Sequence, residues 1–187
     1  NKHGRTARNE YGPTETTIVS IAGYITPEDV KRKRMPIGRP IGNTRVYILD
    51  KNKEPLPIGV KGELYIGGEG LAKGYLGDET LTKERFINDP FIPGKQVYRT
   101  GDQARWLPDG TIEFSGRLDD QVKIRGFRVE LGEIETQLVL HEKVMEGVVL
   151  MKENNGDKFL VAYYVSDNAL ETTALKNFLQ VRLPDYM

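Results

Sequence analysis

The sequence predicts an α+β protein in two parts, a β-rich part followed by a small α+β unit. In residues 36–115 short apolar runs alternate with glycine and proline, which is typical of strands joined by turns. Residues 121–187 instead show the order strand, helix, strand, strand, helix. Because the pattern changes near residues 118–120, we expect two domains, residues 1–118 and 119–187.

The first part begins with a β-branched run, residues 16–25, which predicts a buried strand after the turn at Gly12-Pro13. The Pro-Asp-Gly sequence at 108–110 predicts a hairpin turn, with Ile112 and Phe114 on one face of the following strand. Alternation and helical spacing predict the other elements: strands at 44–50 and 62–68, a helix at 77–87, and the two strands of that hairpin within 103–116.

The second part begins with a strand-like segment at 121–130. Leu131, Ile134 and Leu138 then form one apolar stripe, which predicts a helix at 131–142. The remaining predicted elements are a hairpin at 147–166, built around an Asn-Gly turn, and an amphipathic helix at 174–183 that Pro184 ends.

The composition argues against several classes of protein. The 27 basic and 27 acidic side chains give a formal net charge of zero, so we expect no nucleic-acid partner and no anionic membrane partner. No apolar run approaches the roughly 18–20 residues of a membrane helix. The chain has no cysteine, and therefore no thiolate nucleophile, disulfide or cysteine zinc site. We expect a cytoplasmic location, since a reducing compartment fits this composition.

Three further patterns are interpreted as structural. Gly68, Gly70 and Gly74 do not match the spacing of a dinucleotide-binding loop, so we expect a loop whose glycines adopt positive φ angles. The basic run at 31–34 has no interleaved aromatic residues, which favours a solvated loop. The two histidines lack the spacing of a metal site.

Two segments carry side chains suited to a nucleotide site. In NEYGPTETT, residues 9–17, the Glu15 carboxylate suits Mg²⁺ and the neighbouring hydroxyls suit phosphate. In RTGD, residues 99–102, we expect a strand end and a tight turn, from which Asp102 can accept two hydrogen bonds from a ribose diol. Either segment alone is more often only a capped turn.

Five motifs taken together are more specific. They are NEYGPTETT, GELYIGGEGLAKGYL, YRTGD, GRLDDQVKIRGFRVELGEIE and a terminal LPDYM. In this order and near these spacings, from Asn9 to Met187, the chain resembles the adenylation domains of nonribosomal peptide synthetases, within the superfamily that includes acyl-CoA synthetases and luciferases. The resemblance implies a β-rich, barrel-like C-terminal part of the large adenylation subdomain, residues 1–118, followed by a small mobile α+β subdomain, residues 119–187.

The resemblance also implies roles for individual residues. At the nucleotide they are Asn9 beside the base, Tyr11 on the adenine face, Phe114 near the base, Asp102 at the ribose hydroxyls, and Arg117 at ribose or phosphate. At the reacting groups they are Thr14 at phosphate, Glu15 at Mg²⁺, and Glu10, Ile18 and Val19 along the amino-acid pocket. Asp119 matches the hinge of the family, and Lys123, counted here as catalytic, opens the loop that moves toward the active site for the second half-reaction.

The implied reaction has two halves. An amino acid and ATP give an aminoacyl-adenylate and pyrophosphate, and the acyl group then passes to the phosphopantetheine thiol of a carrier domain, in the synthesis of peptide antibiotics or other secondary metabolites. The implied cofactors are ATP and Mg²⁺. The implied partners are an amino-acid substrate and the carrier and condensation domains of a larger synthetase.

The chain also departs from the family pattern. The Ser/Thr/Gly-rich phosphate loop, the pocket aspartate that anchors the amino group and the segment with the catalytic lysine are absent, so we expect a fragment that is inactive alone. Two alternatives stay open: a free-standing acyl- or aryl-acid-activating ligase of the same superfamily, and a non-catalytic binding module. The activated amino acid is not identified, although Glu10 suggests a polar side chain if it does not simply lie at the pocket rim.

Overall fold

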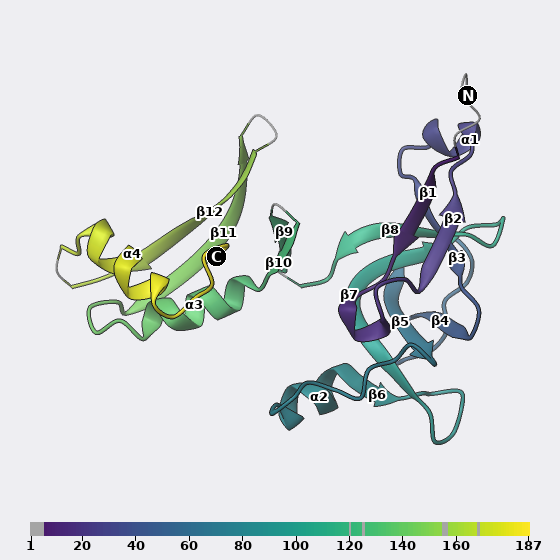
Figure 1. Ribbon diagram of the computed structural model, residues 1–187, viewed down its shortest axis with the longest axis horizontal. Coiled ribbons are helices and arrows are strands. Elements are labelled where there is room, and N and C mark those ends of the chain that lie inside the picture. The colour runs from purple at the N-terminus through teal and green to yellow at the C-terminus, as the bar shows by residue number, and fades with distance from the viewer. Residues whose placement is uncertain (1–5, 120, 125, 155–156, 168) are drawn as a thin grey trace. The chain divides into compact units, whose positions relative to one another are not determined.

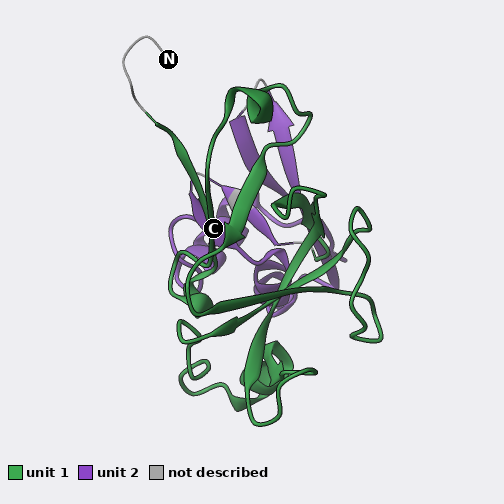
Figure 2. Ribbon diagram, turned by 90° about the vertical axis from the view of Figure 1, so that its right-hand side faces the viewer, with its two compact units in different colours: residues 1–119 green, residues 120–187 purple. Residues whose placement is uncertain are grey.

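The structure is a computed structural model, and it describes residues 6–119, 121–124, 126–154, 157–167 and 169–187. The backbone of Lys123 is described but its side chain is not. The chain divides into two compact units, residues 1–119 (unit 1) and 120–187 (unit 2), which Figure 2 shows in separate colours.

Unit 1 is an eight-stranded antiparallel sheet (Figure 1). The strand order is β1-β2-β3-β8-β7-β5-β4, and β6 pairs with β7. The bounds are β1 Arg8–Tyr11, β2 Ile21–Tyr24, β3 Pro36–Pro40, β4 Thr44–Leu49, β5 Gly62–Gly68, β6 Phe86–Asn88, β7 Gln96–Trp106 and β8 Ile112–Arg117. The predicted fold class is confirmed, although the described strands form an open sheet and not a closed barrel.

Three short helical segments connect these strands. They are the 3₁₀ helix η1 Thr14–Thr16, α1 Pro27–Val30 and α2 Glu79–Arg85. The α2 helix was predicted from its spacing, and it begins where the Asp78 side chain accepts a hydrogen bond from Leu81 N at 2.8 Å. The α1 helix was not predicted, although Thr26 and Asp29 form a reciprocal capping box at its start.

The predicted strand at 16–25 is wrong in its first half. Tyr11 pairs with Ile21, so residues 12–20 form the loop of a β1–β2 hairpin. Within this loop Thr17 and Ile18 adopt left-handed backbone angles, with φ of 62° and 67°. The tight return of the chain therefore overrides the β propensity of these β-branched residues.

Apolar side chains cover both faces of the unit 1 sheet. Leu64 and Ile66 on β5 belong to one buried cluster, whereas Tyr65 between them belongs to another. This alternation is the two-residue period of a strand. Because Ile66 pairs with Tyr98, the side chain of Tyr98 on β7 lies on the same face as Leu64 and Ile66.

Unit 2 contains two hairpins and two helices. The bounds are β9 Val122–Ile124, β10 Phe127–Val129, α3 Leu131–Val139, β11 Glu146–Asn154, β12 Asp157–Val165 and α4 Thr172–Gln180. Buried residues of α3, α4 and β11 form its core, including Leu138, Val149 and Leu175. The predicted hairpin at 147–166 and the predicted helix at 131–142 are present, with bounds that differ by a few residues.

Two predictions for unit 2 need correction. The single strand predicted at 121–130 is a β9–β10 hairpin, in which Val122 pairs with Val129 and Gly126 has a φ of 87°. Glycine permits that left-handed angle, and so the chain reverses there. The last helix ends at Gln180, before Pro184, and Leu183 contributes to the core from outside the helix. Among the described residues, no helix is long and apolar enough to cross a membrane.

Candidate functional site

The predicted nucleotide residues of unit 1 meet at the junction of β1, β7 and β8. The Tyr11 hydroxyl donates a hydrogen bond to Asp102 Oδ2, and Arg117 Nη1 donates to Asp102 Oδ1 at 2.7 Å. Asp102 is only 7% exposed, so a cation and a hydroxyl satisfy a largely buried carboxylate. Three motifs that are far apart in the sequence therefore meet at one acidic side chain.

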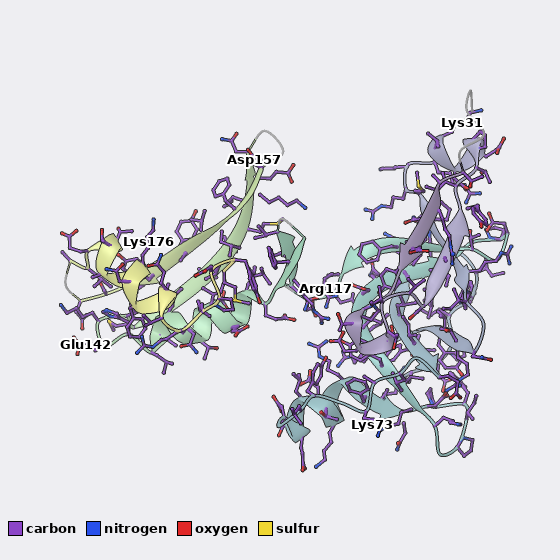
Figure 3. The ribbon with its side chains drawn as sticks, in the orientation of Figure 1. Lys31, Lys73, Arg117, Glu142, Asp157 and Lys176 are labelled. Carbon is purple, nitrogen blue, oxygen red and sulfur yellow. The ribbon has the colours of Figure 1, made fainter. Side chains whose placement is uncertain are left out.

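Arg117 also holds Asp119. Its Nε and Nη2 donate to the two carboxylate oxygens of Asp119, each at 2.6 Å. A second arginine, Arg85 at the end of α2, places Nη1 3.8 Å from Asp119 Oδ2. Figure 3 shows Arg117, the last residue of β8. Its guanidinium group binds both Asp119, the predicted hinge residue, and Asp102, the predicted ribose ligand.

The environment of Asp102 corrects one prediction. RTGD is not a strand end, because β7 continues through these residues to Trp106. The strand is irregular there: Gly101 has a φ of 72°, and the register with β8 shifts between Gln103 and Ala104. Such a bulge redirects a side chain within a strand, which a turn-based interpretation of Gly-Asp does not anticipate.

Aromatic rings lie beside this carboxylate. The ring of Tyr11 is 6.1 Å from that of Phe114, and both pack partly buried against the core of unit 1. Burial, together with the adjacent Asp102 carboxylate, raises the pKa of Tyr11 well above 10, so its hydroxyl remains a hydrogen-bond donor at neutral pH. Asn9 is on the same face of β1 as Tyr11, and its amide donates to Pro36 O at 2.8 Å.

Glu15 forms a second cluster on unit 1. It is 9% exposed, and its Oε1 accepts hydrogen bonds from the hydroxyls of Tyr75 at 2.7 Å and Tyr98 at 2.8 Å. The two hydroxyl oxygens are 3.2 Å apart. Tyr75 and Tyr98 were not predicted as site residues, although both lie within quoted motifs and Tyr98 is fully buried. A buried tyrosine needs a partner for its hydroxyl, and that was the available signal.

The other predicted residues are placed differently. Thr14 and Ile18 are exposed, Ile18 by 72%, and Val19 is half-buried. Glu10 alternates with Asn9 and Tyr11 along β1, so its side chain is on the opposite face of the strand, where it pairs with Arg8 at 3.3 Å. The structure thus brings Tyr11, Asp102, Arg117 and Asp119 together but not Glu10 with them.

Lys123 belongs to unit 2. Its backbone lies in β9, paired with Arg128 of β10. Its side chain lies outside the described residues, as does all of Arg125, the third residue of the predicted moving loop. The role of this loop therefore stays a prediction.

A metal ion has a limited set of protein ligands on this surface. Within the described part of the chain, no group of three or more His, Cys, Asp or Glu side chains is arranged to hold a metal. Mg²⁺ in nucleotide enzymes is usually held by one or two carboxylates together with substrate phosphates and water. The single Glu15 carboxylate fits that mode and does not fit an all-protein cage.

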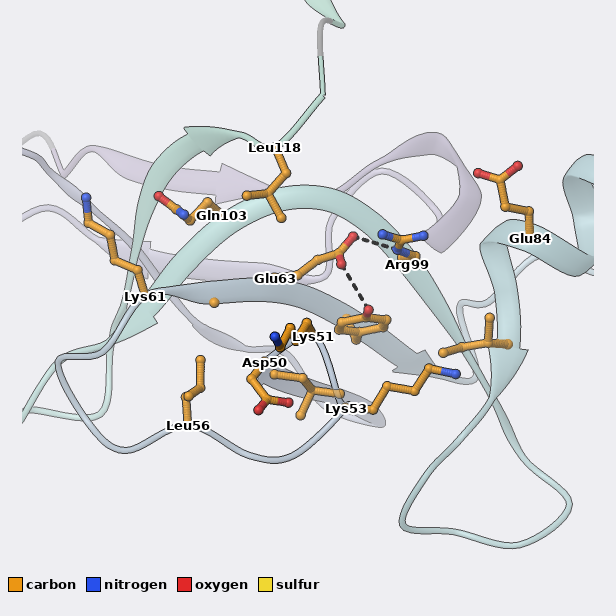
Figure 4. Close-up of a pocket in the computed structure, with 14 residues that line it drawn as sticks. Asp50, Lys51, Lys53, Leu56, Lys61, Glu63, Glu84, Arg99, Gln103 and Leu118 are labelled. Carbon is orange, nitrogen blue, oxygen red and sulfur yellow. Dashed lines mark hydrogen bonds and ion pairs between the residues drawn. The ribbon is translucent and has the colours of Figure 1, made fainter.

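A cavity of unit 1 lies elsewhere. It has a volume of about 730 Å³ and is lined by residues that include Glu63, Tyr65 and Arg99 (Figure 4). Tyr65 and Arg99 are paired on neighbouring strands, on the face of the sheet opposite to Leu64 and Ile66. None of the predicted site residues lines it, so this cavity does not mark the candidate site.

Comparisons with known proteins agree with the family that the five motifs indicate. Residues 1–76 match the family model of the AMP-binding enzymes. The chain is 53% identical over 189 residues to a linear gramicidin synthase of Brevibacillus parabrevis, covering 98% of this chain and 2% of that protein. It is 51% identical over 181 residues to bacitracin synthase 1 of Bacillus licheniformis, covering 96% of this chain and 3% of that protein. The chain thus spans a few per cent of the length of these curated relatives.

Solved structures are also similar to this chain. The structure of PA1221, an NRPS protein containing adenylation and PCP domains, is similar with a TM-score of 0.80 and 33% identity, over 93% of this chain and 36% of that chain. The crystal structure of IdnL1 is similar with a TM-score of 0.84 and 30% identity, over 96% of this chain and 37% of that chain. The family resemblance predicted from the five motifs is therefore confirmed.

Proposed function

This chain is homologous to the adenylation domains of nonribosomal peptide synthetases, within the AMP-binding enzyme family, and we therefore propose that it forms part of an amino-acid-activating ligase. The proposed reaction converts an amino acid and ATP to aminoacyl-AMP and pyrophosphate. The observation that supports it most directly is the meeting of Tyr11, Asp102 and Arg117, from three separate motifs, at one partly buried site.

In this proposal unit 1 holds the nucleotide. The rings of Tyr11 and Phe114 offer an aromatic surface for adenine, with the Asn9 amide beside the base. The Asp102 carboxylate accepts hydrogen bonds from the ribose hydroxyls. Because Arg117 already contacts Asp102, it is placed to move from that carboxylate to the ribose or a phosphate of the bound nucleotide.

The chemical step requires two anions to approach each other. A carboxylate oxygen of the amino acid attacks the α-phosphorus, the bond to the bridging oxygen breaks, and pyrophosphate leaves, so no proton transfer is needed. Thr14 and Arg117 stabilise phosphate charge, and Glu15 would hold Mg²⁺, which neutralises phosphate charge when bound. Catalysis then depends on positioning and charge neutralisation more than on a general base.

The second half-reaction transfers the acyl group to a carrier domain. The phosphopantetheine thiol attacks the acyl carbon, the thiol proton is lost to solvent, and AMP leaves. We propose that unit 2 moves about Asp119 for this step and presents the segment that begins at Lys123. The NRPS protein PA1221 combines adenylation and PCP domains in one chain, which supports a carrier-domain partner here as well.

An exchange assay tests the proposed function. The synthetase that carries this chain should catalyse amino-acid-dependent exchange of pyrophosphate into ATP, with one or a few amino acids preferred. Exchange that depends on aryl or fatty acids instead would favour the free-standing acid ligase. Absence of exchange together with tight ATP binding by residues 1–187 would favour a binding module.

We also propose that residues 1–187 do not complete the reaction alone. The phosphate loop, the amino-group anchor and the catalytic-lysine segment of the family have no counterpart in this sequence. Purified residues 1–187 should therefore show no exchange under conditions in which the whole synthetase is active, and clear exchange would mean that these functions reside in residues assigned otherwise here.

A further inference from the structure

The turn that carries Glu15 has a strained backbone, and contacts with another segment of the chain hold it in place. Thr17 and Ile18 both adopt left-handed angles, which are unfavourable and which β-branched residues rarely adopt. Such a conformation persists only where the surroundings determine it. The contacts that determine it therefore indicate which parts of the protein serve Glu15.

The glycine-rich segment 67–74 supplies two of these contacts. Ala72 N donates to Glu15 O at 2.9 Å, and Thr17 Oγ1 donates to Gly70 O at 2.7 Å. A β-carbon at Gly70 would lie 3.1 Å from Thr16 O, so the absence of a side chain permits this close approach. The segment that does not match a nucleotide-binding loop thus braces the Glu15 turn.

The same segment places Tyr75. Thr82 Oγ1 of α2 accepts a hydrogen bond from Tyr75 N at 2.8 Å. The rings of Tyr75 and Tyr98 both pack against Phe86, with centroids 5.6 and 5.2 Å away. Contacts with α2, β6 and β7 therefore hold the two tyrosines where their hydroxyls reach Glu15.

We propose that Tyr75 and Tyr98 are positioning residues that orient the Glu15 carboxylate toward the metal–nucleotide complex. This inference rests on the proposed function of the site. It gives GELYIGGEGLAKGYL and YRTGD a shared task, because each motif supplies one of the two hydroxyls.

Two donors on one oxygen have a definite physical effect. With both hydroxyls bound to Oε1, rotation of the carboxylate about its terminal bond is restricted, and the direction of Oε2 is set. The arrangement is thus fixed before a ligand binds, which is the condition for effective charge stabilisation.

Nucleotide binding tests the proposal in the synthetase that carries this chain. The dissociation constant of a non-hydrolysable ATP analogue is measured by calorimetry with and without Mg²⁺, for the parent, Tyr75→Phe and Tyr98→Phe. The phenylalanine variants retain the ring and remove only the hydroxyl. We expect the tightening of analogue binding by Mg²⁺ to fall by roughly three- to tenfold in each variant, the size expected for one hydrogen bond.

Tyr47→Phe is the matched control. The Tyr47 hydroxyl also donates to a carboxylate, Asp89 Oδ2 at 3.3 Å, but in the cluster on the other face of the sheet. Urea denaturation of all three variants reports loss of stability. If Tyr75→Phe and Tyr98→Phe lower stability like the control and leave the Mg²⁺ effect on analogue binding unchanged, the tyrosines only brace the fold and the proposal is wrong.

The experiment also separates this proposal from the proposed function. If the parent synthetase neither binds the analogue nor catalyses exchange, the proposed function fails. If the parent does both and its Mg²⁺ effect is unaltered by either phenylalanine, only the positioning role fails.

Discussion

Arg117 holds Asp119 by two parallel hydrogen bonds, from Nε to Oδ1 and from Nη2 to Oδ2, each 2.6 Å long. The same guanidinium group contacts Asp102 through Nη1 at 2.7 Å. Arginine suits this arrangement, since its planar group presents several donors in a fixed geometry. A single side chain therefore connects Asp102, the residue proposed to bind the ribose, to Asp119, the residue proposed as the hinge.

The first prediction concerns that hinge. Proline at position 119 fixes φ near −65° and removes the backbone N–H, so Asp119→Pro should trap one arrangement of the two units. We expect pyrophosphate release to persist and carrier loading to fall steeply when each half-reaction is measured separately. Asp119→Asn, which keeps a flexible backbone, is the control. Equal loss of both half-reactions would indicate misfolding, and no loss of either would make Asp119 a surface residue.

Removal of the Asp102 carboxylate should weaken ATP binding. Asp102→Ala leaves the Tyr11 hydroxyl and Arg117 Nη1 without this acceptor, and each charged hydrogen bond to a bound ribose would contribute about 1.5–3 kcal/mol. We expect the KM for ATP in the exchange assay to rise at least tenfold. Glu63→Gln, which alters an arginine-paired carboxylate on the other face of the sheet, should leave it unchanged. An unaltered KM in Asp102→Ala would remove Asp102 from the ribose role.

Glycine is required at position 101 for two separable reasons. Its φ is 72°, and a β-carbon there would lie 2.7 Å from both Arg117 Nη2 and Asp119 Oδ2. Gly94 has a similar φ of 74° but open space around it, so Gly94→Ala measures the backbone cost alone. We expect urea denaturation to show a loss of about 1 kcal/mol in Gly94→Ala and a clearly larger loss in Gly101→Ala, which should also raise the KM for ATP. Equal losses of stability in the two variants would show that the Arg117 and Asp119 side chains can move away from the added β-carbon without further destabilising the fold.

Alkaline pH should destabilise unit 1 through Tyr65. Burial, and the Glu63 carboxylate that accepts its hydrogen bond, raise the pKa of Tyr65 to about 12. With an unfolded value near 10, the folded state binds more protons between these limits, so stability is retained below pH 10 and falls as the pH rises toward 12. Urea midpoints between pH 9 and 11.5 should fall more steeply for the parent than for Tyr65→Phe. Parallel curves would contradict the shift.

Substrate choice should depend on the loop between β1 and β2. Ile18 is 72% exposed within it and is proposed to line the amino-acid pocket. We expect Ile18→Ala to change the ratio of kcat/KM values among amino acids by about tenfold, with the KM for ATP unaltered, because a few methylene groups discriminate at this level. Ile58→Ala, at another exposed isoleucine, is the control. A uniform loss across all amino acids would instead assign Ile18 to the fold.

Local patterns predicted much of the fold. The β7–β8 and β11–β12 hairpins and the helices α2 and α3 depend on turn residues and apolar spacing within about twenty residues, and these patterns are visible in the sequence. The loop at 12–20 and the β9–β10 hairpin were misassigned, because β propensity there is overridden by left-handed angles at Thr17, Ile18 and Gly126. Those angles follow from where the chain must return, which is not a local property.

The family, and the motif residues Tyr11, Glu15, Asp102, Arg117 and Asp119, could be recognised without a structure, since their types and order are specific when taken together. Which of these residues touch depends on the folded chain. Tyr75 and Tyr98 are 60 and 83 residues from Glu15 along the chain, and both reach its Oε1. Sheet register and packing bring such distant hydroxyls to one oxygen, and no local pattern encodes that distance.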